Sequence, residues 1–172
     1  NAKTTADNAN IPTMETGGQK MPDMWIDKDT GHKVMKLTRR SGSNRSFYFH
    51  NNPFINDHEM VFVGTDVEQA STDMRHNSTA GTIKQMYAVD LNSLAIRQLT
   101  NDPKGISSEI VCAATGQIFF QQRDSIFYVL TAPGKIGKKY FVAKIPEGKT
   151  GNVVCVNCDG TRLAGTFNNP EE

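Results

Sequence analysis

The sequence predicts an all-β domain of the β-propeller class, present here as a partial propeller of about three blades. Three observations predict it. Short stretches rich in Val, Ile, Phe and Tyr alternate with turn residues along most of the chain. No stretch of about 11 or more residues sustains a helical period. Equivalent apolar stretches recur about every forty to fifty residues, the period of four-stranded propeller blades.

Composition and charge exclude several function classes. The chain has 172 residues, 37% of them hydrophobic and 22% charged, which is typical of a globular protein. Its formal net charge is +1, and the longest basic clusters are only two residues long, so a nucleic-acid partner is not expected. No apolar run approaches the ~18 residues that a membrane span requires.

The chain divides by composition into two predicted parts. Residues 1–21 are polar and predict an N-terminal leader or arm, and residues 22–172 predict the N-terminal part of a propeller domain. The arm resembles the segment that follows a cleaved signal peptide or lipoprotein anchor, although an artificial leader would read the same way. This favours a periplasmic or secreted protein over a cytoplasmic one.

The expected strands follow from apolar and aromatic alternation. They cover residues 33–38, 46–50, 59–63, 85–91, 95–100, 109–113, 117–121, 125–130, 140–145, 153–156 and 162–166. Gly-containing turns at residues 114–116 and 158–160 predict two hairpins. Residues 66–82 predict a long inserted loop, and residues 132–139 a shorter Gly- and Lys-rich one.

The repeat groups these strands into blades. Residues 59–63, 85–91 and 95–100 form one unit, residues 117–120, 125–129 and 140–143 a second, and residues 153–165 begin a third. A blade must stack on neighbours, and the ring must close to remove exposed sheet edges, which takes at least about four blades. We therefore expect the remaining blades to come from the rest of a longer protein. A self-contained β-sandwich is the competing structural interpretation.

The three cysteines give no zinc site by spacing. Cys155 and Cys158 form a lone CxxC pair, whereas a structural zinc ion needs four ligands. Cys112 and Cys155 lie in Val- and Ile-rich stretches and are predicted to be small buried side chains on strands.

The four histidines also lack metal-ligand spacing, because none has another at i+2 or i+4. His50 is the most informative of them. It ends the aromatic stretch Phe47-Tyr48-Phe49 and is followed by Asn51 and Asn52. Three hydrogen-bonding side chains would then lie where the innermost strand of a propeller faces the central channel. A buried structural histidine explains the same pattern about equally well.

Three segments carry a family resemblance. They are Thr30-Gly31-His32-Lys33-Val34-Met35-Lys36-Leu37-Thr38, Gly42-Ser43-Asn44-Arg45-Ser46-Phe47-Tyr48-Phe49-His50-Asn51-Asn52-Pro53-Phe54 and Met60-Val61-Phe62. Together they resemble the opening of oligogalacturonate lyases. Tyr87-Ala88-Val89-Asp90-Leu91 and Arg97-Gln98-Leu99-Thr100 match the first-blade pattern of that family. The resemblance covers about residues 25–165.

The resemblance implies a seven-bladed propeller that cleaves short oligogalacturonides by β-elimination with a divalent metal, typically manganese. The family's metal ligands and catalytic base come from later blades, so no metal ligand and no catalytic residue is assigned here. Channel-lining groups for a uronate oligosaccharide are expected instead. The candidates are Arg45, His50, Asn51, Asn52, Arg75 and Arg123. An arginine among them would bind the carboxylate through its two-pronged guanidinium.

Two other functions fit the same residues. One is a non-catalytic propeller that binds protein or glycan at the cell envelope. The other is an accessory domain of a propeller hydrolase or peptidase, for which the sequence offers no Gly-x-Ser-x-Gly motif.

Overall fold

The all-β prediction is confirmed. The computed structural model describes residues 10–49, 51–65, 83–131 and 138–168, and within these ranges it contains strands β1 to β14 and no helix. Accordingly, these residues hold no helix that is long and apolar enough to cross a membrane. The chain separates into two compact units, residues 1–39 and residues 40–172.

The first unit contains a small three-stranded sheet. β1 (Thr13–Met14) pairs in parallel with β2 (Met24–Asp27), and β3 (Lys33–Met35) pairs antiparallel on the other side of β2. Trp25 of β2 is buried, and its indole N–H donates to the Thr16 hydroxyl at 2.8 Å. Residues within the predicted arm thus take part in this sheet. The domain boundary near residue 21 stays a prediction.

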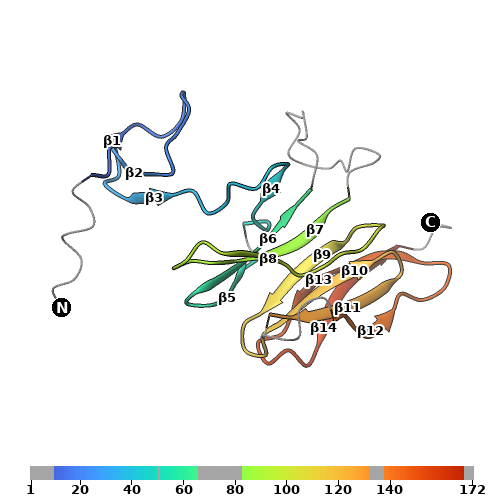
Figure 1. Cartoon of the computed structure of the whole chain (residues 1–172). Helices are drawn as coiled ribbons and strands as arrows, with labels where there is room; N and C mark the ends of the chain where they lie inside the picture. The colour runs from blue at the N-terminus through green and yellow to red at the C-terminus, as the bar shows by residue number, and fades with distance from the viewer. Residues whose placement is uncertain (1–9, 50, 66–82, 132–137, 169–172) are drawn as a thin grey trace. The chain divides into compact units, whose positions relative to one another are not determined.

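The second unit contains three antiparallel sheets, which we call sheets I, II and III (Figure 1). Sheet I consists of β4 (Asn44–Arg45), β5 (Phe54–Asn56), β6 (Glu59–Gly64), β7 (Gln85–Asp90) and β8 (Ile96–Gln98). Its order is β4-β6-β7-β8, and β5 also pairs with β6. The first predicted unit of the repeat is therefore confirmed as one meander, β6-β7-β8.

Sheets II and III correspond to the second and third predicted units. Sheet II consists of β9 (Ser107–Cys112), β10 (Gln117–Gln122), β11 (Ser125–Leu130) and β12 (Tyr140–Lys144) in chain order. Sheet III is the hairpin of β13 (Thr150–Val156) and β14 (Leu163–Asn168). Both predicted hairpins are confirmed, and Gly116 and Gly160 in their turns have φ values of 67° and 73°, where glycine is favoured.

Sheet II lies between the other two sheets, because its alternating side chains feed two separate cores. Ile118, Phe120 and Val129 pack with Val61 and Met86 of sheet I. On the opposite face of sheet II, Ile110, Phe119 and Ile126 pack with Val153 of sheet III. Strand side chains point alternately to the two faces of a sheet, so the aromatic and β-branched repeat specifies stacking on both sides.

Polar contacts tie the sheets together at their seams. Arg97 of β8 forms an ion pair with Glu59 of β6 and donates to the carbonyl of Thr131, directly after β11, at 3.1 Å. Gln121 of β10 donates to the carbonyl of Gly151 in β13 at 2.9 Å. These bonds fix sheet I to sheet II and sheet II to sheet III.

Two expectations from the sequence are wrong. Residues 46–49 do not form a strand: β4 ends at Arg45, and only Phe47 of the aromatic run is buried. Cys112 is buried as predicted, but Cys155 is exposed, since it lies on the side of sheet III away from sheet II. The predicted loop 66–82 and residues 132–137 lie outside the described residues.

Candidate functional site

The first strands of the three sheets each lie at the boundary of their own sheet, and we call this set the first-strand edge (β4, β5, β9 and β13). The Ser108 hydroxyl of β9 donates to the Asn152 side-chain carbonyl of β13 at 3.3 Å, so two of these strands lie next to each other. Polar side chains on this edge are the natural candidates for binding a polar ligand.

Three of the predicted site residues lie on one segment of that edge. Arg45 is exposed in β4, opposite Val63 of β6. Asn51 and Asn52 lie between β4 and β5. The Asn51 amide donates to the Tyr48 carbonyl at 2.8 Å, and the Asn52 side-chain oxygen accepts from the Phe54 amide at 3.1 Å. Arg45, Asn51 and Asn52 therefore lie on one segment of the chain, residues 44–56.

Of the other three predicted residues, the structure describes only Arg123, which lies in sheet II. Arg123 is exposed in the turn between β10 and β11 of sheet II, with a φ of 56°. The Arg123 carbonyl accepts a hydrogen bond from Gln121 Nε2 at 2.7 Å. The Gln121 side chain also donates to β13. His50 and Arg75 lie outside the described residues. The ligand-binding roles of all six residues stay predictions.

Two aromatic residues on the same segment were missed by the sequence reasoning. Tyr48 and Phe49 are 64% and 86% exposed, and their ring centroids lie 4.5 Å apart with the planes tilted by 43°. Strand alternation would have turned one of them inward. The turn signal Asn51-Asn52-Pro53 directly after the run could have indicated a loop here.

A second guanidinium, that of Arg40, contacts the first residue of β4. Arg40 lies over the Tyr87 ring, 4.0 Å from its centroid, and donates to the Tyr87 hydroxyl at 2.9 Å and to Asn44 Oδ1 at 3.0 Å. It therefore buttresses the strand that carries Arg45. Arg45 itself projects into solvent, where it can meet an anionic ligand.

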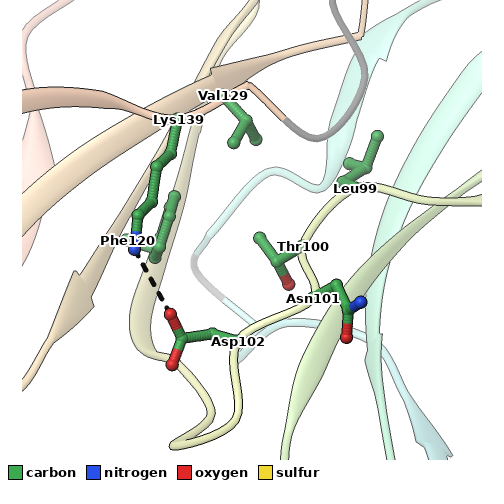
Figure 2. A pocket seen from close by; sticks show the side chains of 7 residues that line it. All are labelled: Leu99, Thr100, Asn101, Asp102, Phe120, Val129 and Lys139. Carbon is green, nitrogen blue, oxygen red and sulfur yellow. Dashed lines mark hydrogen bonds and ion pairs between the residues drawn. The ribbon is translucent and has the colours of Figure 1, made fainter.

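A small pocket lies between sheets I and II (Figure 2). It is lined by Leu99, Thr100, Asn101, Asp102, Phe120, Val129 and Lys139. Figure 2 shows Lys139 reaching toward Asp102, with which it forms an ion pair at 3.3 Å. The cavity measures about 110 Å³. Ligand sites usually need about 300 Å³ or more. This pocket is therefore a small gap between two sheets and is too small to be an oligosaccharide site.

The described residues contain no group of three or more His, Cys, Asp or Glu side chains placed to hold a metal ion. What the described edge can do is bind: it offers a cation for a carboxylate, carboxamides for hydroxyl groups, and exposed aromatic faces.

Comparisons with known proteins agree with this fold. No protein-family model matches the chain, and no curated protein does. Among solved structures, an oligogalacturonate lyase in complex with manganese matches 87% of this chain and 36% of its own, with a TM-score of 0.66 and 21% identity. An oligogalacturonate lyase from Vibrio parahaemolyticus matches 82% of this chain and 34% of its own, with a TM-score of 0.61 and 18% identity.

These matches confirm, at the level of the fold, the resemblance seen in the sequence. The chain spans about a third of the length of the two lyases it matches. Over most of its residues, it is folded like that part of an oligogalacturonate lyase.

Proposed function

We propose that this chain forms the first three blades of a seven-bladed propeller that cleaves short oligogalacturonides by β-elimination. The single observation that carries the proposal is the structural match to an oligogalacturonate lyase over 87% of the chain. The stacked meanders support it, because sheets that bury both faces against neighbours are the building principle of a propeller. Sheets I, II and III are the three blades in this proposal.

The proposed reaction is a β-elimination. A base removes the C5 proton of the uronate, the C5–H electron pair forms the C4–C5 double bond, and the C4–O bond breaks. The leaving oxygen then takes a proton from an acid. Neutralising the neighbouring carboxylate makes the C5 proton more acidic, and Arg45 supplies a cation for this task. A guanidinium binds a carboxylate with two parallel hydrogen bonds, which also orients the sugar.

The proposal places the base, the acid and the manganese ligands outside the described residues, which do not provide a metal-binding group. The part played by this chain is therefore to bind and orient the oligosaccharide along the first-strand edge. The remaining blades are the partner that would complete the active site.

The test is direct. The full-length protein is incubated with digalacturonate and manganese, and the absorbance of the newly formed double bond is followed. A rise in absorbance that depends on the protein supports the proposal. No rise with any uronide overturns it, and uronide binding without cleavage would then favour a non-catalytic glycan-binding propeller.

A further inference from the structure

Tyr48 and Phe49 are largely exposed aromatic residues next to a buried one. Their exposed fractions of 64% and 86% contrast with 8% for Phe47, the only ring of this run that enters the core. Phe54, on the same segment, is 43% exposed. Clustered exposed aromatic side chains are uncommon on soluble proteins and indicate a binding surface.

The segment that presents these rings is fixed at both ends. Phe47 on one side and Ile55 on the other belong to the core between sheets I and II. Between them, the Asn51 amide closes a turn onto the Tyr48 carbonyl at 2.8 Å. The two rings are thus held near the surface by buried neighbours, so binding a ligand there would cost little ordering.

The residues that flank the rings in the chain would suit an acidic and hydroxylated ligand. Residues 44–56 include no Asp or Glu, and their charged side chain among the described residues is Arg45. Asn51 and Asn52 add carboxamide groups, which can donate to and accept from hydroxyl groups. If the rings instead packed against another sheet of the same protein, that contact would not require polar groups around it.

We propose that the Tyr48–Phe49 pair, whose rings contact each other, forms a stacking platform that offers one outer ring face to a sugar of a uronate oligosaccharide, with Arg45 facing its carboxylate. This inference rests on the proposed function and names the residues that would hold the substrate. A galacto-configured ring carries three of its C–H bonds on one face. These weakly positive hydrogens match the negative face of an aromatic ring, whose polarity is set by its quadrupole.

The experiment separates stacking from packing by replacing the flat ring with a side chain of similar apolarity. Binding of trigalacturonate to the full-length protein is measured by calorimetry in EDTA, for the wild type, Phe49→Leu and Tyr48→Leu. Each substitution should weaken binding roughly fivefold to tenfold, because a stacked ring contributes beyond its buried area. The midpoint of thermal unfolding should stay unchanged, since both rings project into solvent.

Phe141→Leu is the matched control. Phe141 is 63% exposed, but it lies on β12, the last strand of sheet II, so this variant should bind like the wild type. Neutral galactotriose tests the stacking alone. It should bind more weakly than trigalacturonate because it lacks the carboxylates, yet lose the same factor in Phe49→Leu.

Three outcomes overturn the platform. The first is unchanged trigalacturonate affinity in both variants. The second is a lowered unfolding temperature without a change in affinity, which would mean that protein covers the rings. The third is an equal loss in Phe141→Leu. The absorbance assay, run in parallel, distinguishes the proposed lyase activity from the proposed platform. Cleavage by the wild type with unaltered affinity in the variants rejects only the platform. Ring-dependent binding without cleavage rejects only the lyase activity.

Discussion

Asp27 is the acidic residue whose protonation the structure controls most clearly. Its carboxylate accepts hydrogen bonds from the Thr16 hydroxyl at 2.6 Å, the Thr30 hydroxyl at 2.7 Å and the Thr30 amide at 2.9 Å. These bonds, the one from Thr16 first, lower the pKa of Asp27 from 3.8 to about 2. Because the pKa is lowered by folding, the stabilisation is complete above the unfolded value and is lost as the pH falls from 3.8 to about 2.

This prediction is checked by carboxyl NMR titration of the protein. Thr16→Val should raise the pKa of Asp27 toward its ordinary value, because the variant removes the leading hydrogen bond. The Trp25 indole signal should follow the same titration in the wild type, since Trp25 donates to the Thr16 hydroxyl. A wild-type Asp27 that titrates near 3.8 would contradict the network.

Arg45 carries the residue-scale prediction for activity. In the full-length protein, Arg45→Ala should lower kcat/KM on digalacturonate about 10- to 100-fold, the effect of losing a hydrogen bond to a charged group. Arg45→Lys should recover part of this loss, because it keeps the charge but not the two-pronged geometry. Steady-state absorbance kinetics give the measurement.

The control for Arg45 is Arg162→Ala, which removes the same charge from an exposed position beside the β13–β14 turn. It should leave kcat/KM unchanged. Equal effects of the two substitutions would show that the loss reflects overall charge and not a site at β4.

Candidate site residues could be predicted from the sequence only where a short local pattern, such as polar residues next to a turn, indicates them. Arg45, Asn51 and Asn52 are polar residues around a turn; Arg45 and Asn52 are exposed, Asn51 is half-buried, and their binding roles stay predictions. Tyr48 and Phe49 were missed because an aromatic run in a strand-rich sequence is normally a core signal. Which ring of the run enters the core is decided by the space that sheets I and II leave, and Phe47 fills it.

At the scale of elements, Arg97 should hold sheet I to sheet II, while its ion pair with Glu59 lies within sheet I. Glu59 is buried, and Arg97 also reaches the Thr131 carbonyl across the seam. Arg97→Met would leave the Glu59 carboxylate unpaired and should cost about 2 to 3 kcal/mol of unfolding free energy. Urea denaturation measures it.

The double variant Glu59→Met/Arg97→Met tests the cause. It removes both charges and should be more stable than Arg97→Met alone, because no uncompensated carboxylate remains. If the double variant is no more stable than Arg97→Met alone, the pair contributes through packing and not through charge compensation.

The β13–β14 turn offers a second element-scale prediction. A Cβ at Gly160 would lie 2.8 Å from Thr115 Cγ2 and 3.0 Å from Cys112 Sγ, so the turn of sheet III packs tightly on the end of β9. Gly160→Ala should therefore cost about 1 to 3 kcal/mol for overpacking. It should also cost about 1 to 2 kcal/mol for its left-handed backbone.

Gly148→Ala separates the backbone cost from the overpacking cost. Gly148 has the same φ of +73°, but no atom lies within 4 Å of its added Cβ. This variant should show the backbone cost alone in urea denaturation. Equal losses in the two variants would show that sheet III does not pack on β9 as described.

Elements were predictable in proportion to their length. β6, β7, β10 and β11 each have six residues with apolar alternation or a continuous apolar run, and all four were expected. β1 and β5 have two and three residues, too few to show a period. They form because β2 and β6 offer them backbone groups to pair with. Their own sequence therefore does not show that they are strands; the neighbouring strand decides it.

The whole molecule shows an asymmetry between its sheets. Sheet II has core on both faces, whereas sheet III has core on the face toward sheet II. On sheet III, Val154 and Phe167 are 47% and 52% exposed, and Cys155 is exposed as well. Under the proposed propeller, a further blade would cover the outer face of sheet III, as sheet I covers sheet II.

Cys155 can report whether that blade is present. Cys155 pairs with Ala164, one position from Val156 and Leu163, which pack toward sheet II, so its side chain faces the other way. In the native full-length protein, a maleimide reagent should label Cys155 slowly, because the next blade covers it. Cys158, exposed in the turn, should react fast and buried Cys112 slowly, so the chain contains both references. Mass spectrometry of the labelled peptides measures the three rates. If Cys155 reacts as fast as Cys158, the outer face of sheet III is open to solvent and the stack of blades does not continue there.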